Sequence, residues 1–171
     1  MLGFEREARV VTDALEPREE PTRARGGASS AADAKSTRAA TDPCSLLTPR
    51  DIQQVAGWTT PAGTHPVENS ADGHTACNFT EPKFAGMVQI QVYDHGGRAA
   101  FDRRRSEAEH LALGAGNVVT VPGTVAAFEI PEHGLVGLLV GDAFAQVVTL
   151  GPGVTDRQQH EMAVIVAGNL A

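Results

Sequence analysis

The sequence predicts an α+β domain in which a largely antiparallel sheet of about five strands packs against two or three helices. Three observations predict this class. Strand-like runs come in groups, helix start and stop signals separate the groups, and the links between elements are short. The expected element order is α-β-β-α-β-β-β-α, within a single domain over residues 44–171.

The first helix is expected to begin directly after Thr48. Thr48 can cap the helix, Pro49 suits its first turn, and Asp51 favours the positive end of the helix dipole. Gly57 then ends the helix, because glycine adopts the left-handed conformation common at this position. A loop that contains glycine and proline follows, up to the first predicted strand.

Two strands come next, at residues 76–80 and 87–93. The second alternates residue by residue between two sets: Val88, Ile90 and Val92, and Gln89, Gln91 and Tyr93. This period of two predicts one buried face and one partly wet face, as in an antiparallel sheet.

The middle of the chain predicts a second helix and two further strands. His95-Gly96-Gly97 breaks the preceding strand, and a helix is expected over residues 98–113. Strand signals resume at residues 117–121 and 125–130.

The end of the chain contains the best hairpin signal. Apolar runs at residues 135–140 and 143–150 are joined by Gly141-Asp142, a pair that suits a two-residue turn with positive φ. The last helix is expected to begin after Thr155, which forms a capping-box pair with Gln158.

Residues 1–43 differ from the rest and are expected to form a flexible arm and linker. They are dense in charge, with Phe4 as the single aromatic residue, and residues 26–41 are mostly small and polar. The apolar residues of Phe4–Leu15 have helical spacing, which leaves two interpretations open. The segment is either an amphipathic helix that docks on a partner or a marginal helix that frays alone.

Composition excludes several classes of protein. The formal net charge of -7 argues against general nucleic-acid binding, which needs a basic surface. No apolar run is long enough to cross a bilayer. No apolar core of a secretory signal appears near the start, so the chain as written would stay in the cytoplasm.

The two cysteines, Cys44 and Cys77, have two interpretations from spacing alone. If bonded, they close a loop worth roughly 3–4 kcal/mol of stability and fasten the first helix to the sheet. The alternative is two unrelated buried thiols, as in cytosolic proteins.

The stretches Asp42-Pro43-Cys44-Ser45-Leu46-Leu47-Thr48-Pro49 and Cys77-Asn78-Phe79 resemble a domain family of unknown function found mainly in actinobacteria. Members of that family are typically secreted proteins or lipoproteins. The resemblance covers about residues 42–171 and implies that Cys44 and Cys77 pair in a disulfide. It also implies an extracytoplasmic or cell-envelope location. The family's hydrophobic leader is missing here, so either the start is misassigned or truncated, or this member stays inside the cell.

No motif for a metal site, a cofactor or catalysis is found, so we predict none of the three. The histidines lack the spacing of a zinc pair; they are His65, His74, His95, His110, His133 and His160. Asp72-Gly73-His74 could offer ligands beside Cys77, but a disulfide would remove the thiolate. Neither cysteine has a base placed by spacing, and no serine lies in a nucleophile elbow.

The basic cluster of the domain is Arg103-Arg104-Arg105. It could bind a carboxylate, a phosphate or a phospholipid headgroup. The spacing of Arg103 to Glu107 and of Arg105 to Glu109 instead favours ion pairs on a solvated helix face.

We therefore predict a monomeric, non-catalytic cell-envelope domain that one disulfide fastens and that binds a partner protein or a small ligand. The alternative hypothesis is a small cytosolic enzyme, or an enzyme accessory, that uses its histidine and arginine surface.

Overall fold

The protein is described by a computed structural model covering residues 40–66, 73–83, 86–110 and 116–171. All of these residues belong to one compact unit that begins at Arg38. The predicted arm up to residue 39, including the Phe4–Leu15 segment, lies outside the described residues. Three α-helices and a six-stranded antiparallel sheet in the described part confirm the predicted α+β class.

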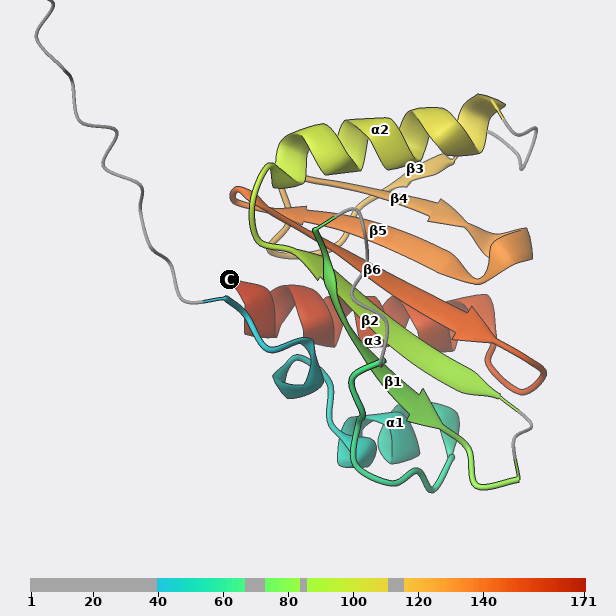
Figure 1. The fold of residues 1–171 in the computed structure, drawn as a ribbon. Helices are drawn as coiled ribbons and strands as arrows, with labels where there is room; N and C mark the ends of the chain where they lie inside the picture. Colours follow the sequence, from blue (N-terminus) through green and yellow to red (C-terminus); the bar gives the residue numbers. More distant parts are fainter. Residues whose placement is uncertain (1–39, 67–72, 84–85, 111–115) are drawn as a thin grey trace, which may run out of the picture. The chain divides into compact units, whose positions relative to one another are not determined.

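The sheet has the strand order β1-β2-β6-β5-β4-β3, and every neighbouring pair is antiparallel (Figure 1). The strands are β1 (Thr75–Thr80), β2 (Met87–Tyr93), β3 (Asn117–Val119), β4 (Ala126–Ile130), β5 (Leu135–Val140) and β6 (Ala143–Leu150). The predicted order had one strand fewer. The strand signals at residues 117–121 and 125–130 form two separate strands, the short edge strand β3 and β4, with the turn at Gly123 between them.

The hairpin prediction is confirmed. Val140 pairs with Ala143 across the two-residue connection, and Gly141 has a φ of 54°. Such a turn needs positive φ, which glycine adopts without steric cost.

The helices begin where the sequence signals place them. They are α1 (Pro49–Ala56), α2 (Gly97–His110) and α3 (Asp156–Leu170), with the short 3-10 helices η1 (Pro43–Ser45) and η2 (Pro131–His133). Thr155 and Gln158 form the predicted reciprocal cap, and Thr48, predicted as a cap, forms a reciprocal pair with Asp51 as well. The predicted extension of α2 to residue 113 falls on residues that are not described.

One face of the sheet is apolar and is covered by α3 (Figure 1). The predicted buried face of β2 packs here together with β5, β6 and the inner side of α3. Its fully buried members include Ile90, Val147, Met162 and Val166. Because β2, β6 and β5 are interior strands of the sheet, this face forms the main core of the domain.

Side chains of α3 also hold the N-terminal part of the domain in place. Asn169 donates a hydrogen bond from Nδ2 to the Leu46 carbonyl at 3.0 Å. Gln158 donates from Nε2 to the Val55 carbonyl, also at 3.0 Å. These two contacts dock the segments around η1 and α1 onto the C-terminal helix.

The opposite face is partly covered by α2 and contains a separate aromatic cluster. Phe101 from α2 meets the rings of Phe128 and Phe144 edge-on, at centroid distances of 5.2 Å and 5.6 Å. Tyr93 stacks on Phe144 at 5.1 Å. The α2 helix is therefore held over β5 and β6 by aromatic contacts, and most of β1 and β2 extends beyond it.

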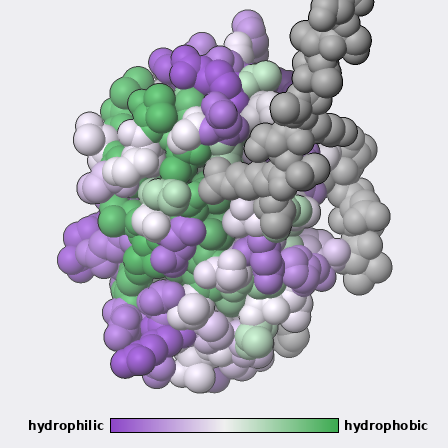
Figure 2. Space-filling model, turned by 90° about the vertical axis from the view of Figure 1, so that its left-hand side faces the viewer, coloured by the Kyte–Doolittle hydropathy of each residue, from purple (hydrophilic) through white to green (hydrophobic). Residues whose placement is uncertain are grey.

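Apolar residues also reach the surface. Val118 and Val125 lie near the β3 edge of the sheet and are largely exposed. Figure 2 shows apolar groups emerging between polar ones on the side that lies at the left in Figure 1. Scattered exposure of this kind is normal in a folded protein and does not by itself define a site.

Gly63→Ala is expected to destabilise the domain. A Cβ at residue 63 would collide with the Cys77 sulfur and the Phe79 ring, both of which are fully buried. We expect a loss of roughly 1–3 kcal/mol in the free energy of unfolding, as for an overpacked core. Denaturant unfolding followed by circular dichroism measures this loss.

Gly168→Ala is the matched control. Its Cβ would meet open space on α3, so alanine should raise the free energy of unfolding by about 0.5–1 kcal/mol. Equal unfolding midpoints for Gly63→Ala and the unmodified protein would contradict the packing described here.

Candidate functional site

A row of amide side chains crosses the α2 face of the sheet beyond the aromatic cluster. Gln89 donates a hydrogen bond from Nε2 to Asn78 Oδ1 at 2.8 Å, and Gln91 donates to Gln89 Oε1. Gln146 lies directly opposite Gln91 across the β2–β6 pair. Gln89 and Gln91, from the predicted partly wet face of β2, are thus part of an amide row that spans three neighbouring strands, whereas Tyr93 of the same face is buried in the aromatic cluster.

The amide row borders a hollow of about 260 Å³ between the sheet and α2. Gln146 is only 3% exposed, although it lies on a central strand and lines this hollow. Apolar side chains complete the lining, including those of Phe128, Ile130 and Leu135. We call this space, with its amide row, the glutamine hollow.

Gly137 explains how the floor of the hollow packs. It pairs with Gln146 on one side and with Phe128 on the other. A Cβ at this position would run into the Phe128 ring, so the ring fills the space that glycine leaves. The hollow therefore has an aromatic wall beside its amides.

Arg104 and Glu107 of α2 form the charged part of the lining. Arg104 donates hydrogen bonds from Nη2 and Nε to the buried Tyr93 hydroxyl at 3.0 Å and 3.3 Å. Its Nη1 donates to Glu107 Oε2 at 3.1 Å. Partial burial alone would lower the pKa of Arg104, but the interactions with Tyr93 and Glu107 outweigh it and raise this pKa above its ordinary value.

The other two arginines of the basic cluster behave as their spacing predicts. Arg103 pairs with Glu107 at 3.9 Å, and Arg105 pairs with Glu109 at 3.5 Å. These partly exposed i,i+4 pairs contribute little stability. The three arginines therefore have different roles. Arg104 contacts Tyr93 of the sheet, whereas Arg103 and Arg105 form ion pairs along α2.

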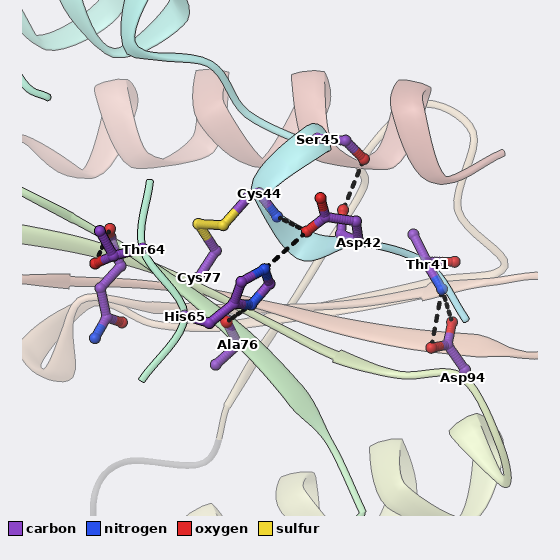
Figure 3. Close-up of polar contacts among 10 residues, drawn as sticks. Thr41, Asp42, Cys44, Ser45, Thr64, His65, Ala76, Cys77 and Asp94 are labelled. Carbon is purple, nitrogen blue, oxygen red and sulfur yellow. Dashed lines mark hydrogen bonds and ion pairs between the residues drawn. A yellow bond between two sulfur atoms is a disulfide. The ribbon is translucent and has the colours of Figure 1, made fainter. Parts of the chain in front are cut away.

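A disulfide joins Cys44, in η1, to Cys77, in β1 (Figure 3). The two Cα atoms are 5.1 Å apart, within the normal range for a disulfide. The pairing implied by the family resemblance is confirmed. The bond fastens the start of the domain to the edge strand of the sheet.

His65 and Asp42 lie directly beside this bond, as Figure 3 shows. The His65 Nε2 atom is 3.4 Å from Asp42 Oδ1, and the other ring nitrogen, Nδ1, is 2.9 Å from the Ala76 carbonyl oxygen. Asp42 Oδ1 also accepts a hydrogen bond from the Cys44 backbone N–H at 2.9 Å. We call Asp42, Cys44, His65 and Cys77 the disulfide corner.

A β-bridge brings His65 to the disulfide corner. The backbone groups of Thr64 and Asn78 exchange hydrogen bonds of 2.9 Å and 2.8 Å, so the loop after α1 runs beside β1. The sequence offered no signal for this single bridge. It therefore gave no reason to associate His65 with either cysteine.

A larger hollow, of about 340 Å³, lies where β5 begins and β6 ends, between η2 and the start of α3. Its ionisable lining residues Glu132, His133 and Asp156 are all exposed. Exposed charges at strand and helix ends are common on any protein surface. The glutamine hollow is the stronger candidate for a ligand site, because it contains a buried polar group on a central strand.

Three comparisons with known proteins found no match for this chain. No protein-family model matches the chain, and no curated protein or solved structure matches it significantly. The resemblance to an actinobacterial family therefore stays a prediction. No helix in the described part of the chain is long and apolar enough to span a membrane.

Removing the disulfide is expected to destabilise the domain strongly. In the double variant Cys44→Ser/Cys77→Ser, the unfolded chain regains the freedom that the cross-link denies it. We expect a loss of roughly 3–4 kcal/mol in the free energy of unfolding. Urea unfolding of the variant and of the oxidised protein measures the difference, and unchanged midpoints would show that the bond contributes nothing.

Proposed function

We propose that this protein is a non-catalytic binding domain of the cell envelope that holds a small, neutral, amide-bearing ligand in the glutamine hollow. The observation that carries the proposal is the burial of Gln146 on the central strand β6, opposite Gln91. Burying an amide costs about 1–3 kcal/mol unless hydrogen bonds compensate for it. The core of the domain is formed by apolar groups on the opposite face of β6, such as Val147. The fold therefore does not depend on an amide at position 146.

The lining of the hollow indicates the chemistry of the ligand. Gln146 carries a carbonyl acceptor and an N–H₂ donor side by side, which complements the N–H and carbonyl of a secondary amide. The charged lining residues, Arg104 and Glu107, are paired with each other and so favour a neutral ligand over an ion. Apolar residues on the other side suit the ligand's hydrocarbon part.

The disulfide supports the envelope location in this proposal. Stable disulfides belong mainly to oxidising compartments, whereas cytosolic thiols are kept reduced. The rival hypothesis of a cytosolic enzyme relied on the histidine and arginine surface. Two arginines of that surface, Arg103 and Arg105, form ion pairs with Glu107 and Glu109 of the same helix.

Ligand binding is tested by titrating ¹⁵N-labelled protein with an N-acetylated dipeptide amide and, separately, with an N-acetylated amino sugar. The two probes share the secondary amide and distinguish a peptide source from a sugar source. We expect at least one probe to shift the side-chain N–H₂ signals of Gln89, Gln91 and Gln146 in a saturable way. Failure of both probes to shift these signals would overturn the amide-ligand proposal.

Gln146→Met is the informative variant for this site. Methionine has nearly the same volume but no hydrogen-bonding amide, so we expect the probe's binding to be lost. The free energy of unfolding should stay unchanged or rise, because such swaps usually cost less than about 1.5 kcal/mol and no amide is then buried. Gln54→Leu, on the exposed surface of α1, is the control and should bind normally.

The compartment is tested by mass spectrometry of the protein from its source cells, after alkylation without a reductant. We expect Cys44 and Cys77 to be unalkylated and the chain to be two hydrogens lighter than the reduced form. Two alkylated cysteines would remove the envelope part of the proposal while leaving the binding part to be judged by the titrations.

A further inference from the structure

The disulfide corner contains a set of metal-ligating atoms that the proposed function does not use. One ligand atom from each of Asp42, Cys44 and His65 lies within 4.8 Å of the others. Cys77 adds a second sulfur, because its Sγ is bonded to that of Cys44. A carboxylate oxygen, an imidazole nitrogen and the two bonded sulfurs thus lie in the same corner of the domain, as Figure 3 shows.

His65 is already oriented as a metal-binding histidine would be. A histidine that binds a metal through one ring nitrogen usually donates the N–H of the other to a carbonyl or carboxylate. Here Nδ1 lies 2.9 Å from the Ala76 carbonyl oxygen, which leaves Nε2 facing Asp42 at 3.4 Å, beside Cys44. This orientation comes from the bridge between Thr64 and Asn78 and does not depend on the disulfide itself.

We propose that the reduced protein binds one Zn²⁺ ion at the disulfide corner through Cys44, Cys77, His65 and Asp42. Two thiolates, one imidazole and one carboxylate form a four-coordinate set of the kind that zinc accepts. Thiolate ligands favour zinc over magnesium or calcium, which prefer oxygen ligands. The oxidised protein lacks the site, because both sulfurs are then joined to each other.

The exchange between the two forms balances in electrons and protons. In a newly made chain both cysteines are thiols, and Zn²⁺ binds as the two thiol protons pass to water. A dithiol reductant converts the disulfide to the same state. Its two S–H groups are oxidised to a disulfide, the Cys44–Cys77 bond breaks, and each released sulfur takes one proton.

Both forms close the same loop between η1 and β1. The disulfide does so covalently, and the metal does so through bonds to Cys44 and Cys77. Zinc would therefore hold the domain together in a reducing environment, before the disulfide forms. The inference does not depend on the glutamine hollow or its ligand.

The test uses the full chain, reduced with a phosphine under anaerobic conditions and titrated first with Co²⁺ and then with Zn²⁺. We expect the visible spectrum of tetrahedral cobalt with thiolate-to-metal charge transfer, saturating at one equivalent and abolished by one equivalent of Zn²⁺. The oxidised protein should show no charge-transfer band. Absence of the tetrahedral spectrum from the reduced protein would overturn the proposal.

Variants separate this site from binding by cysteines alone. His65→Ala and Asp42→Asn change exposed side chains, and each should weaken zinc binding by at least about 10–100-fold in competition with a chromophoric chelator. His110→Ala, at the exposed end of α2, is the control and should leave the affinity unchanged. Equal zinc affinity for His65→Ala and the unmodified protein would refute the proposed ligand set.

Circular dichroism covers the case in which the reduced, metal-free chain loses its fold. Recovery of the folded spectrum on addition of one equivalent of Zn²⁺ would support the site, since metal binding is then coupled to folding. A chain that stays unfolded with excess Zn²⁺ would contradict it.

Discussion

On β2 and β6, one face of the sheet is packed against α3 and the other carries polar side chains. The rest of the structure depends on this difference between the two faces. Both β2 and β6 are interior strands of the sheet, so the side chains on each of their two faces must find a suitable environment. The α3 helix covers the apolar side completely enough to supply the main core of the domain. The other side is then free to carry polar groups, and α2 packs on its aromatic part and borders the hollow beside it. The glutamine hollow exists because one well-packed face can tolerate an opposite face that is not optimised for stability.

Local signals were sufficient to predict most of the elements but not their juxtaposition. The helix caps at Thr48 and Thr155, the turn at Gly141 and the alternation of β2 all depend on neighbouring residues, and the structure has each of them. The meeting of Gln91 with Gln146 depends on the register between strands far apart in the chain. Alternation revealed a wet face of β2, but only the register makes it one side of a hollow.

The disulfide corner is a second example of a juxtaposition that local sequence signals do not predict. The pairing of Cys44 with Cys77 was implied by a resemblance and is confirmed, whereas no signal in the sequence placed His65 beside this bond. Asp72-Gly73-His74 is close to Cys77 in sequence, but Asp72 lies outside the described residues, and the described histidine that lies near the Cys44 sulfur is His65. A single bridge at Thr64 decides this, and isolated bridges leave no periodic pattern in a sequence. Predictions of sites fail most readily where one tertiary contact selects the residue.

The start of the folded domain also determines how it responds to a mechanical pull. The backbone N–H of Thr41 donates to both carboxylate oxygens of Asp94, at 3.2 Å and 3.1 Å, just after β2 ends. Tension applied through the chain before Thr41 would first break these bonds and then reach Cys44. There the disulfide carries the force into β1, so no further chain can be drawn out unless the whole edge strand detaches. The length of chain that a moderate force can extract is therefore limited to the few residues before the cross-link.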